Sequence, residues 1–71
     1  MSPEELKKLE KNVKKTKRLA SEQAMELHDL IEDRLPAAYM EIMPTAQATF
    51  DACKTWDEAC QTLKAAQAET A

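Results

Sequence analysis

The sequence predicts an all-α protein, an antiparallel hairpin of two helices, and three observations support this. The 71 residues include no glycine, which removes the tight turns that β-hairpins favour and every glycine-rich phosphate loop. Aromatic residues make up 4% of the chain, whereas Ala, Leu, Lys, Glu and Gln, which favour helices, are abundant. Apolar side chains recur with a period near 3.5 residues. A chain of this length forms one domain, residues 1–71.

The first predicted helix has a clear start and a clear apolar seam. Ser2 at the N-cap, Pro3 at the first helical position and Glu5 at the third form a capping box. Ala24 and Ile31 widen the seam on one side. The seam itself, which includes two polar residues, comprises Leu6, Leu9, Val13, Thr16, Ala20, Gln23, Leu27 and Leu30.

A proline separates the two helices. Pro36 biases Leu35 away from helical angles and suits the first position of a new helix. Pro44 interrupts the second helix early, which predicts a kink or a short first segment near it. Thr55 could cap a third helix, but its place within the apolar stripe favours one continuous helix. The predicted bounds are 3–34 for the first helix, 35–36 for the turn, 37–64 for the second helix and 65–71 for a frayed tail.

A hairpin of this size has difficulty burying its apolar residues. The predicted seam of the second helix comprises Tyr39 or Met40, Met43, Ala46, Phe50, Cys53, Trp56, Cys60 and Leu63. In a hairpin each seam faces one partner, and a chain this short seldom builds a sufficient core unaided. Two hairpins can dimerise into a four-helix bundle, or the flanks can be covered by a different protein. Either solution makes the chain an association module.

Charge is distributed unevenly along the chain, whose net charge is −3. Residues 1–18 carry a net +4, and residues 22–41 carry −5. A basic face could bind RNA or an acidic protein, or could simply be solvated. The acidic total and the lack of aromatic residues among these lysines argue against nucleic acid. The basic face, which follows helical spacing, comprises Lys7, Lys11, Lys14 and Arg18.

The residues that could support chemistry are few, so we expect no enzyme activity, no cofactor and no metal site. His28 and Glu32 share a helix face, but the single His of the chain cannot complete a closed zinc site. We expect His28 to pair with a carboxylate instead. Cys53 and Cys60 would lie about 10 Å apart along a helix, too far for a disulfide. They are expected to be reduced thiols facing the core.

Apolar runs in the sequence fall short of the roughly 18 to 20 residues of a membrane span. The first residues are acidic and polar, unlike a secretion signal. We therefore expect a cytoplasmic protein that does not contact membranes. Near the turn, Tyr39, Met40 and Met43 would be the best anchors for another protein if they are exposed.

The segment around the turn resembles a known family. LHDLIEDRLP at residues 27–36, followed by YMEIM at residues 39–43, is similar to Rop-like helical hairpins found beside nitrogen-fixation genes. Those proteins carry an "LHDLxEDLP … EIM" stretch after a lysine-rich helix, and the likeness covers about residues 5–64. Arg34 is an extra residue relative to that pattern, and Pro44 is a second departure; both affect the geometry of the turn.

The resemblance implies a non-enzymatic accessory protein of the nitrogenase system. Such a protein would bind the molybdenum–iron protein, or an assembly or damaged form of it, and stabilise that state. The free protein could be a homodimer, and the alternative is an RNA-binding helical bundle that uses the basic face. The partner-binding residues implied by position are those nearest the turn: His28, Asp29, Glu32, Asp33, Tyr39, Met40 and Met43.

Overall fold

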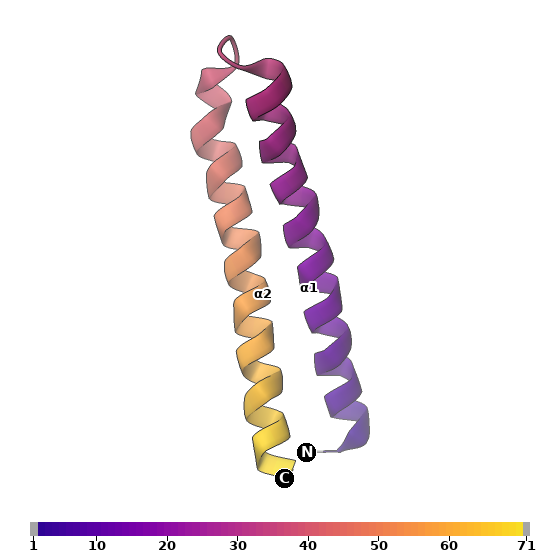
Figure 1. Cartoon of the computed structure of the whole chain (residues 1–71). Coiled ribbons are helices and arrows are strands. Elements are labelled where there is room, and N and C mark those ends of the chain that lie inside the picture. The colour runs from indigo at the N-terminus through magenta and orange to yellow at the C-terminus, as the bar shows by residue number, and fades with distance from the viewer. Residues whose placement is uncertain (1, 71) are drawn as a thin grey trace.

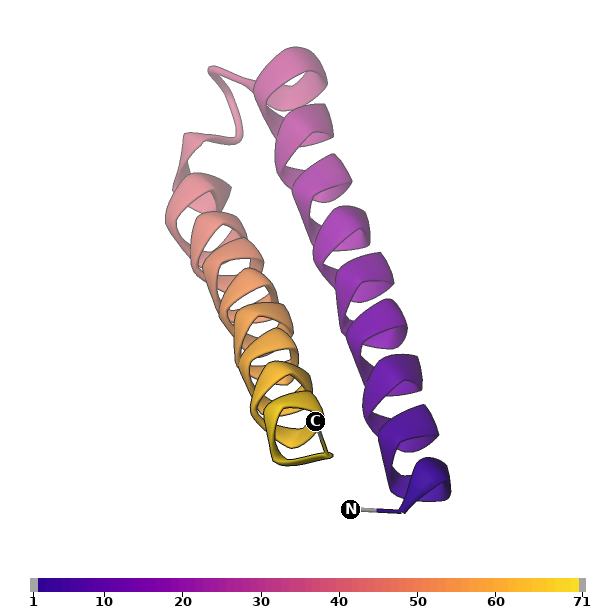
Figure 2. The same cartoon turned by 60° about the horizontal axis from the view of Figure 1, so that its bottom comes forward.

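The computed structural model describes residues 2–70 and confirms the all-α hairpin. Two long helices lie side by side and run in opposite directions, so that the hairpin as a whole is an elongated rod (Figures 1 and 2). The rod measures 52 × 14 × 12 Å. Its elements are α1 (Pro3–Asp29), a π-helical turn η1 (Leu30–Arg34), a 3-10 turn η2 (Tyr39–Glu41) and α2 (Ile42–Thr70). None of the helices described is both long and apolar enough to cross a membrane.

α1 begins as the capping box predicts. The backbone of Ser2 is extended, and its side-chain oxygen accepts a hydrogen bond from the N–H of Glu5 at 3.3 Å. This bond satisfies one of the N–H groups that the first turn of a helix leaves without an acceptor. Pro3 lies in the same turn, where its missing N–H costs no helical hydrogen bond.

The seam of α1 also lies where the sequence predicts it. All of its residues are buried or half-buried, and Leu30 is fully enclosed. The buried Thr16 donates its hydroxyl to the carbonyl oxygen of Asn12 at 2.7 Å and lies 3.1 Å from that of Val13. A polar side chain is thus accommodated in the seam because its own helix satisfies it.

The turn is longer than the two residues predicted. The N–H of Leu35 donates to the carbonyl of Leu30, five residues back, at 3.2 Å. This wider π turn accommodates the additional Arg34. Leu35 is extended, as expected before proline, and the Leu35–Pro36 peptide bond is cis. Because residues 35–38 form the turn, Pro36 does not start the second helix, which begins only after η2.

α2 is one continuous helix that starts at Ile42, not at residue 37. Pro44 is its third residue, in the turn where backbone N–H groups have no helical acceptor, so the proline is accommodated at the helix start. The short first segment is therefore η2, and Pro44 does not mark a kink inside a helix. Thr55 caps no third helix, because its hydroxyl donates to the carbonyl of Asp51, one turn back, at 2.9 Å.

The tail is helical for longer than predicted. α2 continues to Thr70, whereas the sequence placed its end at residue 64 and a frayed tail at 65–71. Ala66 is 3% exposed and is buried between the helices, and this contact stabilises the last part of α2. Alanine is also the strongest helix former. Ala71 lies outside the described residues.

The face of α2 that packs on α1 is displaced by one residue from the predicted seam. Met43, Phe50 and Cys53, predicted to lie in the seam, are exposed instead. Small side chains allow the two helices to approach closely. The Thr49 hydroxyl lies 2.9 Å from the carbonyl oxygen of Thr45 in its own helix and 3.2 Å from that of Gln23 across the interface. The residues of α2 that form the interface are Ile42, Thr45, Thr49, Ala52, Trp56, Ala59, Leu63 and Ala66.

Candidate protein-binding surface at the turn end

The residues that the sequence nominates as partner contacts come together at the turn end of the rod. They belong to the last residues of α1, to η1, to η2 and to the first turn of α2. All of them are exposed to solvent. We call this set the turn-end surface: His28, Asp29, Glu32, Asp33, Tyr39, Met40 and Met43.

The apolar part of the turn-end surface is unusually exposed. Tyr39 is 65% exposed, Met40 78% and Met43 77%. Large apolar side chains that gather in water mark interaction sites, and flexible methionines adapt to the shape of a partner. The three side chains are therefore exposed, as anchors for another protein need to be.

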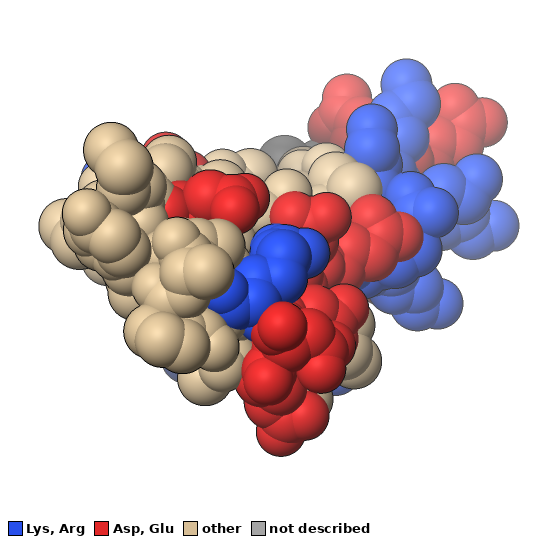
Figure 3. All heavy atoms as spheres, turned by 90° about the horizontal axis from the view of Figure 1, so that it is seen from above, with Lys and Arg blue, Asp and Glu red and all other residues tan. Residues whose placement is uncertain are grey.

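The acidic part surrounds the single histidine. His28 Nε2 lies 3.3 Å from a carboxylate oxygen of Glu32, and Nδ1 lies 3.7 Å from one of Asp29. His28 therefore lies beside two carboxylates. Seen from above, Asp and Glu side chains gather over the α1 side of the turn end, while uncharged side chains cover the α2 side (Figure 3). An apolar patch thus lies beside an anionic one.

The basic face lies elsewhere. Its four residues are exposed along the first part of α1, toward the end of the rod opposite the turn. In Figure 3 the other Lys and Arg side chains lie behind the acidic cluster, which itself encloses a basic side chain. The structure therefore separates the two charged regions along the rod instead of combining them in one site.

Four exposed large apolar side chains were not among the predicted contacts: Leu19, Met25, Ile31 and Phe50. Ile31 is 55% exposed and Phe50 63%. The signal that could have found Phe50 is a second apolar stripe on α2, one residue from the observed interface and with the same alternating spacing of three and four. Sequence reasoning merged the two stripes and assigned the larger side chains to the core.

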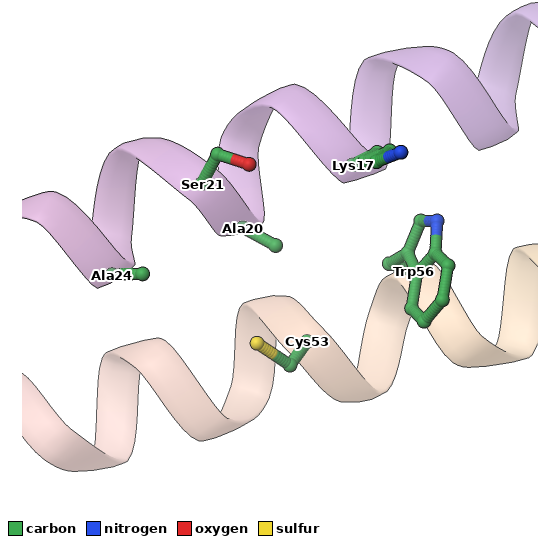
Figure 4. Close-up of a pocket in the computed structure, with 6 residues that line it drawn as sticks. All are labelled: Lys17, Ala20, Ser21, Ala24, Cys53 and Trp56. Atoms are coloured by element: carbon green, nitrogen blue, oxygen red, sulfur yellow. The ribbon is translucent and has the colours of Figure 1, made fainter.

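Two open hollows flank the helix interface. One, of about 140 Å³, is lined by Thr16 and Leu19 of α1 and by Ala52 and Thr55 of α2. The other, of about 230 Å³, lies on the opposite side, where Lys17 and three small side chains of α1 line it together with Cys53 and Trp56 of α2 (Figure 4). The indole N–H of Trp56 is buried and has no hydrogen-bond acceptor within the described chain.

The thiols and carboxylates do not assemble into a larger cluster. Cys53 is exposed and Cys60 is half-buried, and both are free thiols, so Cys53 does not face the core as predicted. In the part of the chain that the structure describes, no group of three or more His, Cys, Asp or Glu side chains is placed to hold a metal ion.

The comparison with known proteins identifies the family. No curated protein and no solved structure matches the chain significantly. A family model described as Rop-like matches residues 4–68, nearly the whole hairpin, including both helices and the turn-end surface. The chain therefore belongs to the Rop-like family.

Proposed function

We propose that this chain is a non-enzymatic accessory protein that binds another protein through the turn-end surface. The observation that supports this most is the exposure of Tyr39, Met40 and Met43 beside an acidic cluster. Apolar anchors contribute contact energy when a partner's pocket buries them. Neighbouring carboxylates favour a basic partner surface and raise the association rate.

The partner we propose is the molybdenum–iron protein of nitrogenase, or an assembly or damaged form of it. The likeness of residues 27–43 to hairpins found beside nitrogen-fixation genes supports this choice. A protein that binds one form of a target in preference to the others stabilises that form by mass action. Binding alone would therefore be enough to stabilise that form of the molybdenum–iron protein. The proposal places the chain in the cytoplasm, with both thiols reduced.

A direct binding measurement tests the proposal. The full chain is titrated against purified molybdenum–iron protein, in its complete form and in a form that lacks its cofactor. We expect saturable binding with a preference for one form. Replacing both Tyr39 and Met40 by Ala should weaken it at least about tenfold, because anchor residues dominate contact energy.

The matched control is Met25→Ala, which removes another exposed methionine, 59% exposed on α1. This variant should bind as the parent does. Unchanged binding by the double variant, or no binding of either form by the parent, would overturn the proposal.

RNA binding is the second candidate, because Lys7, Lys11 and Lys14 are all exposed on α1. Phosphate contacts by these lysines would make affinity fall steeply with salt. Replacing the three lysines by Ala should then abolish binding to a labelled RNA duplex. If RNA affinity is unmeasurable in the parent, or insensitive to those changes, this candidate is eliminated.

A further inference from the structure

The carboxylates of the turn-end surface are not neutralised by basic side chains of the hairpin. Residues 22–41 carry a net −5, and Arg34 is the one Lys or Arg in this segment. Among the described residues the only ion pairs are the two of His28, so Arg34 pairs with none of its acidic neighbours. The negative charge of this end is therefore available to attract a cationic partner.

The position of the acidic part is unfavourable for the fold itself. Asp29 is the last residue of α1, and Glu32 and Asp33 follow in η1. The C-terminal end of a helix carries a partial negative charge, so acidic residues near it are destabilising. The N-terminus of α2, at the same end of the rod, would favour acidic residues, yet its first turn holds none and only Glu41 lies just before it. The stability of the fold thus does not explain where these carboxylates lie, whereas binding of a cation does.

The acidic and apolar parts lie next to each other because they belong to different helices. The acidic part is on the α1 side of the turn end and the apolar part is on the α2 side (Figure 3). Packed helices lie about 8–10 Å apart, and the rod is 14 × 12 Å in cross-section. A partner element as wide as one helix, about 10–12 Å, can therefore contact both parts at once.

Several known modes of peptide recognition do not fit this end of the chain. The described residues form no β-strand, so they offer no sheet edge to an extended segment. A groove for proline-rich segments is lined by several aromatic rings, whereas Tyr39 is the one aromatic residue of the turn-end surface. Phosphorylated segments are bound by clusters of Arg, and this end has Arg34 alone. Docking of an amphipathic helix does fit, because exposed methionines adapt to its apolar face.

An amphipathic helix also carries the complementary pattern. Its side chains at positions i, i+3, i+4 and i+7 share one face, so an apolar stripe and a basic flank can run side by side along it. The stripe would face the apolar part of the turn-end surface, and the flank would face the acidic part. At 1.5 Å per residue, about nine residues cross the 14 Å width of the rod. Two to three helical turns are therefore enough.

We infer that the turn-end surface recognises a short basic amphipathic helix of its partner. The helix lies across the end of the rod, with its apolar stripe on the apolar part and its Lys or Arg flank on the acidic part. The inference rests on the proposed function, because it names the chemistry of the partner segment that this same surface binds. A synthetic helix can test it separately from the molybdenum–iron protein.

Fluorescence anisotropy of labelled peptides, titrated with the full chain, is the test. The probe is a peptide of about 14 residues, with Leu at i, i+3, i+4 and i+7 spacing and Lys along one flank. One control peptide alternates the same Leu and Lys residues, which removes the helical stripe, and the other replaces every Lys by Glu. The probe should bind at least about tenfold more tightly than either control, and added salt should weaken its binding.

Neutralising the acidic part tests the role of charge. Asp29→Asn, Glu32→Gln and Asp33→Asn together keep the side-chain shapes, and they should raise the dissociation constant of the probe at least about tenfold and remove most of its salt dependence. A matched control neutralises three exposed carboxylates of α2 away from the turn: Asp51→Asn, Asp57→Asn and Glu58→Gln. This control should bind the probe nearly as the parent does.

Removing the apolar anchors should have a different signature. With Tyr39 and Met40 both replaced by Ala, binding should weaken at least about tenfold, but the remaining affinity should keep its salt dependence because the acidic part is intact. Thermal unfolding gives an independent readout. The variant with Asp29, Glu32 and Asp33 neutralised should unfold at a higher temperature than the parent, since it no longer places negative charge at the C-terminal end of α1.

Three results would overturn the inference. The first is a probe that does not bind, or that binds no better than the alternating peptide. The second is equal weakening by the two sets of neutralised carboxylates, which would show attraction to the net charge alone. The third is a lower unfolding temperature on neutralising the acidic part, which would show that its carboxylates serve the fold.

The outcome for the proposed partner is separate. If the probe binds as expected and neither form of the molybdenum–iron protein does, the proposed partner is wrong and the preference for a basic helix stands. If the molybdenum–iron protein binds and the probe does not, the preference for a basic helix is wrong and the proposed partner stands.

Discussion

The two helices are similar in length, 27 residues for α1 and 29 for α2, yet they present different surfaces to water. α1 has one main apolar seam, which α2 covers, and its outer face is rich in exposed charges. α2 has two apolar stripes, and α1 covers the one in which Thr and Ala residues alternate with a few large side chains such as Trp56. α2 therefore covers the seam of α1, although Leu19 and Met25 of α1 stay exposed, whereas α2 leaves Phe50 and Cys53 exposed to solvent. Which apolar stripe of α2 is buried therefore depends on how the two helices fit together, and not on the hydrophobicity of either helix alone.

The largest effect is expected in the seam of α1. Leu30→Ala removes the fully enclosed side chain at the first position of η1, where the seam ends, and it should lower the free energy of unfolding by about 2–5 kcal/mol through lost burial and a cavity. Urea unfolding followed by circular dichroism at one fixed protein concentration measures the change. Met25→Ala on the exposed face should cost less than about 0.5 kcal/mol. Equal losses in the free energy of unfolding for Leu30→Ala and Met25→Ala would show that the stability of α1 does not depend on one seam.

An intermediate effect is expected where small residues of α2 set the approach of the helices. Ala59→Leu introduces a large side chain at a position 7% exposed, and overpacking should cost about 1–3 kcal/mol. Ala65→Leu, an exposed position on the same helix, serves as the control and should be nearly neutral. Thermal unfolding of both variants gives the comparison. A stabilised Ala59→Leu would mean that the interface has room for large residues.

The smallest effect compares two threonines of the interface. Thr49→Val should cost about 0.5–1.5 kcal/mol. The Thr49 hydroxyl lies 2.9 Å from the carbonyl oxygen of Thr45 in its own helix, but it also lies 3.2 Å from that of Gln23 and so joins α2 to α1. Thr16→Val should cost less, since the Thr16 hydroxyl bonds only within its own helix, to Asn12 and Val13. Urea unfolding of both variants measures the difference between their losses of stability. A larger loss for Thr16 would contradict the role assigned to the interhelical bond.

The fold was predictable because its signals are local. The capping box at Ser2 and the seam from Leu6 to Leu30 occur in one helix and need no knowledge of the partner. The start of α2 was not predictable from Pro36, because the turn at residues 35–38 and η2 depend on how the chain closes. The π turn that accommodates Arg34 was not predictable for the same reason, because it also depends on how the chain closes.

The candidate site was predictable in part. The turn-end residues share one short segment, so their proximity follows from the chain alone. The exposure of Phe50 and Cys53 could not be read from the pattern, because two stripes of equal spacing lie one residue apart on α2. Burial of the larger side chains looks favourable in one helix. In the hairpin, the two helices approach closely through the buried Ala59 and Ala66, and the larger Phe50 stays exposed.

Because the chain folds back once, α1 begins and α2 ends at the same end of a rod 52 Å long. A fusion protein or a dye attached to either terminus would therefore be held far from the turn and leave Tyr39 and Met40 accessible. A short linker between the two ends could close the hairpin into a ring. Opening that ring at the turn would give a permuted chain in which the helices keep their interface but the turn-end surface is cut.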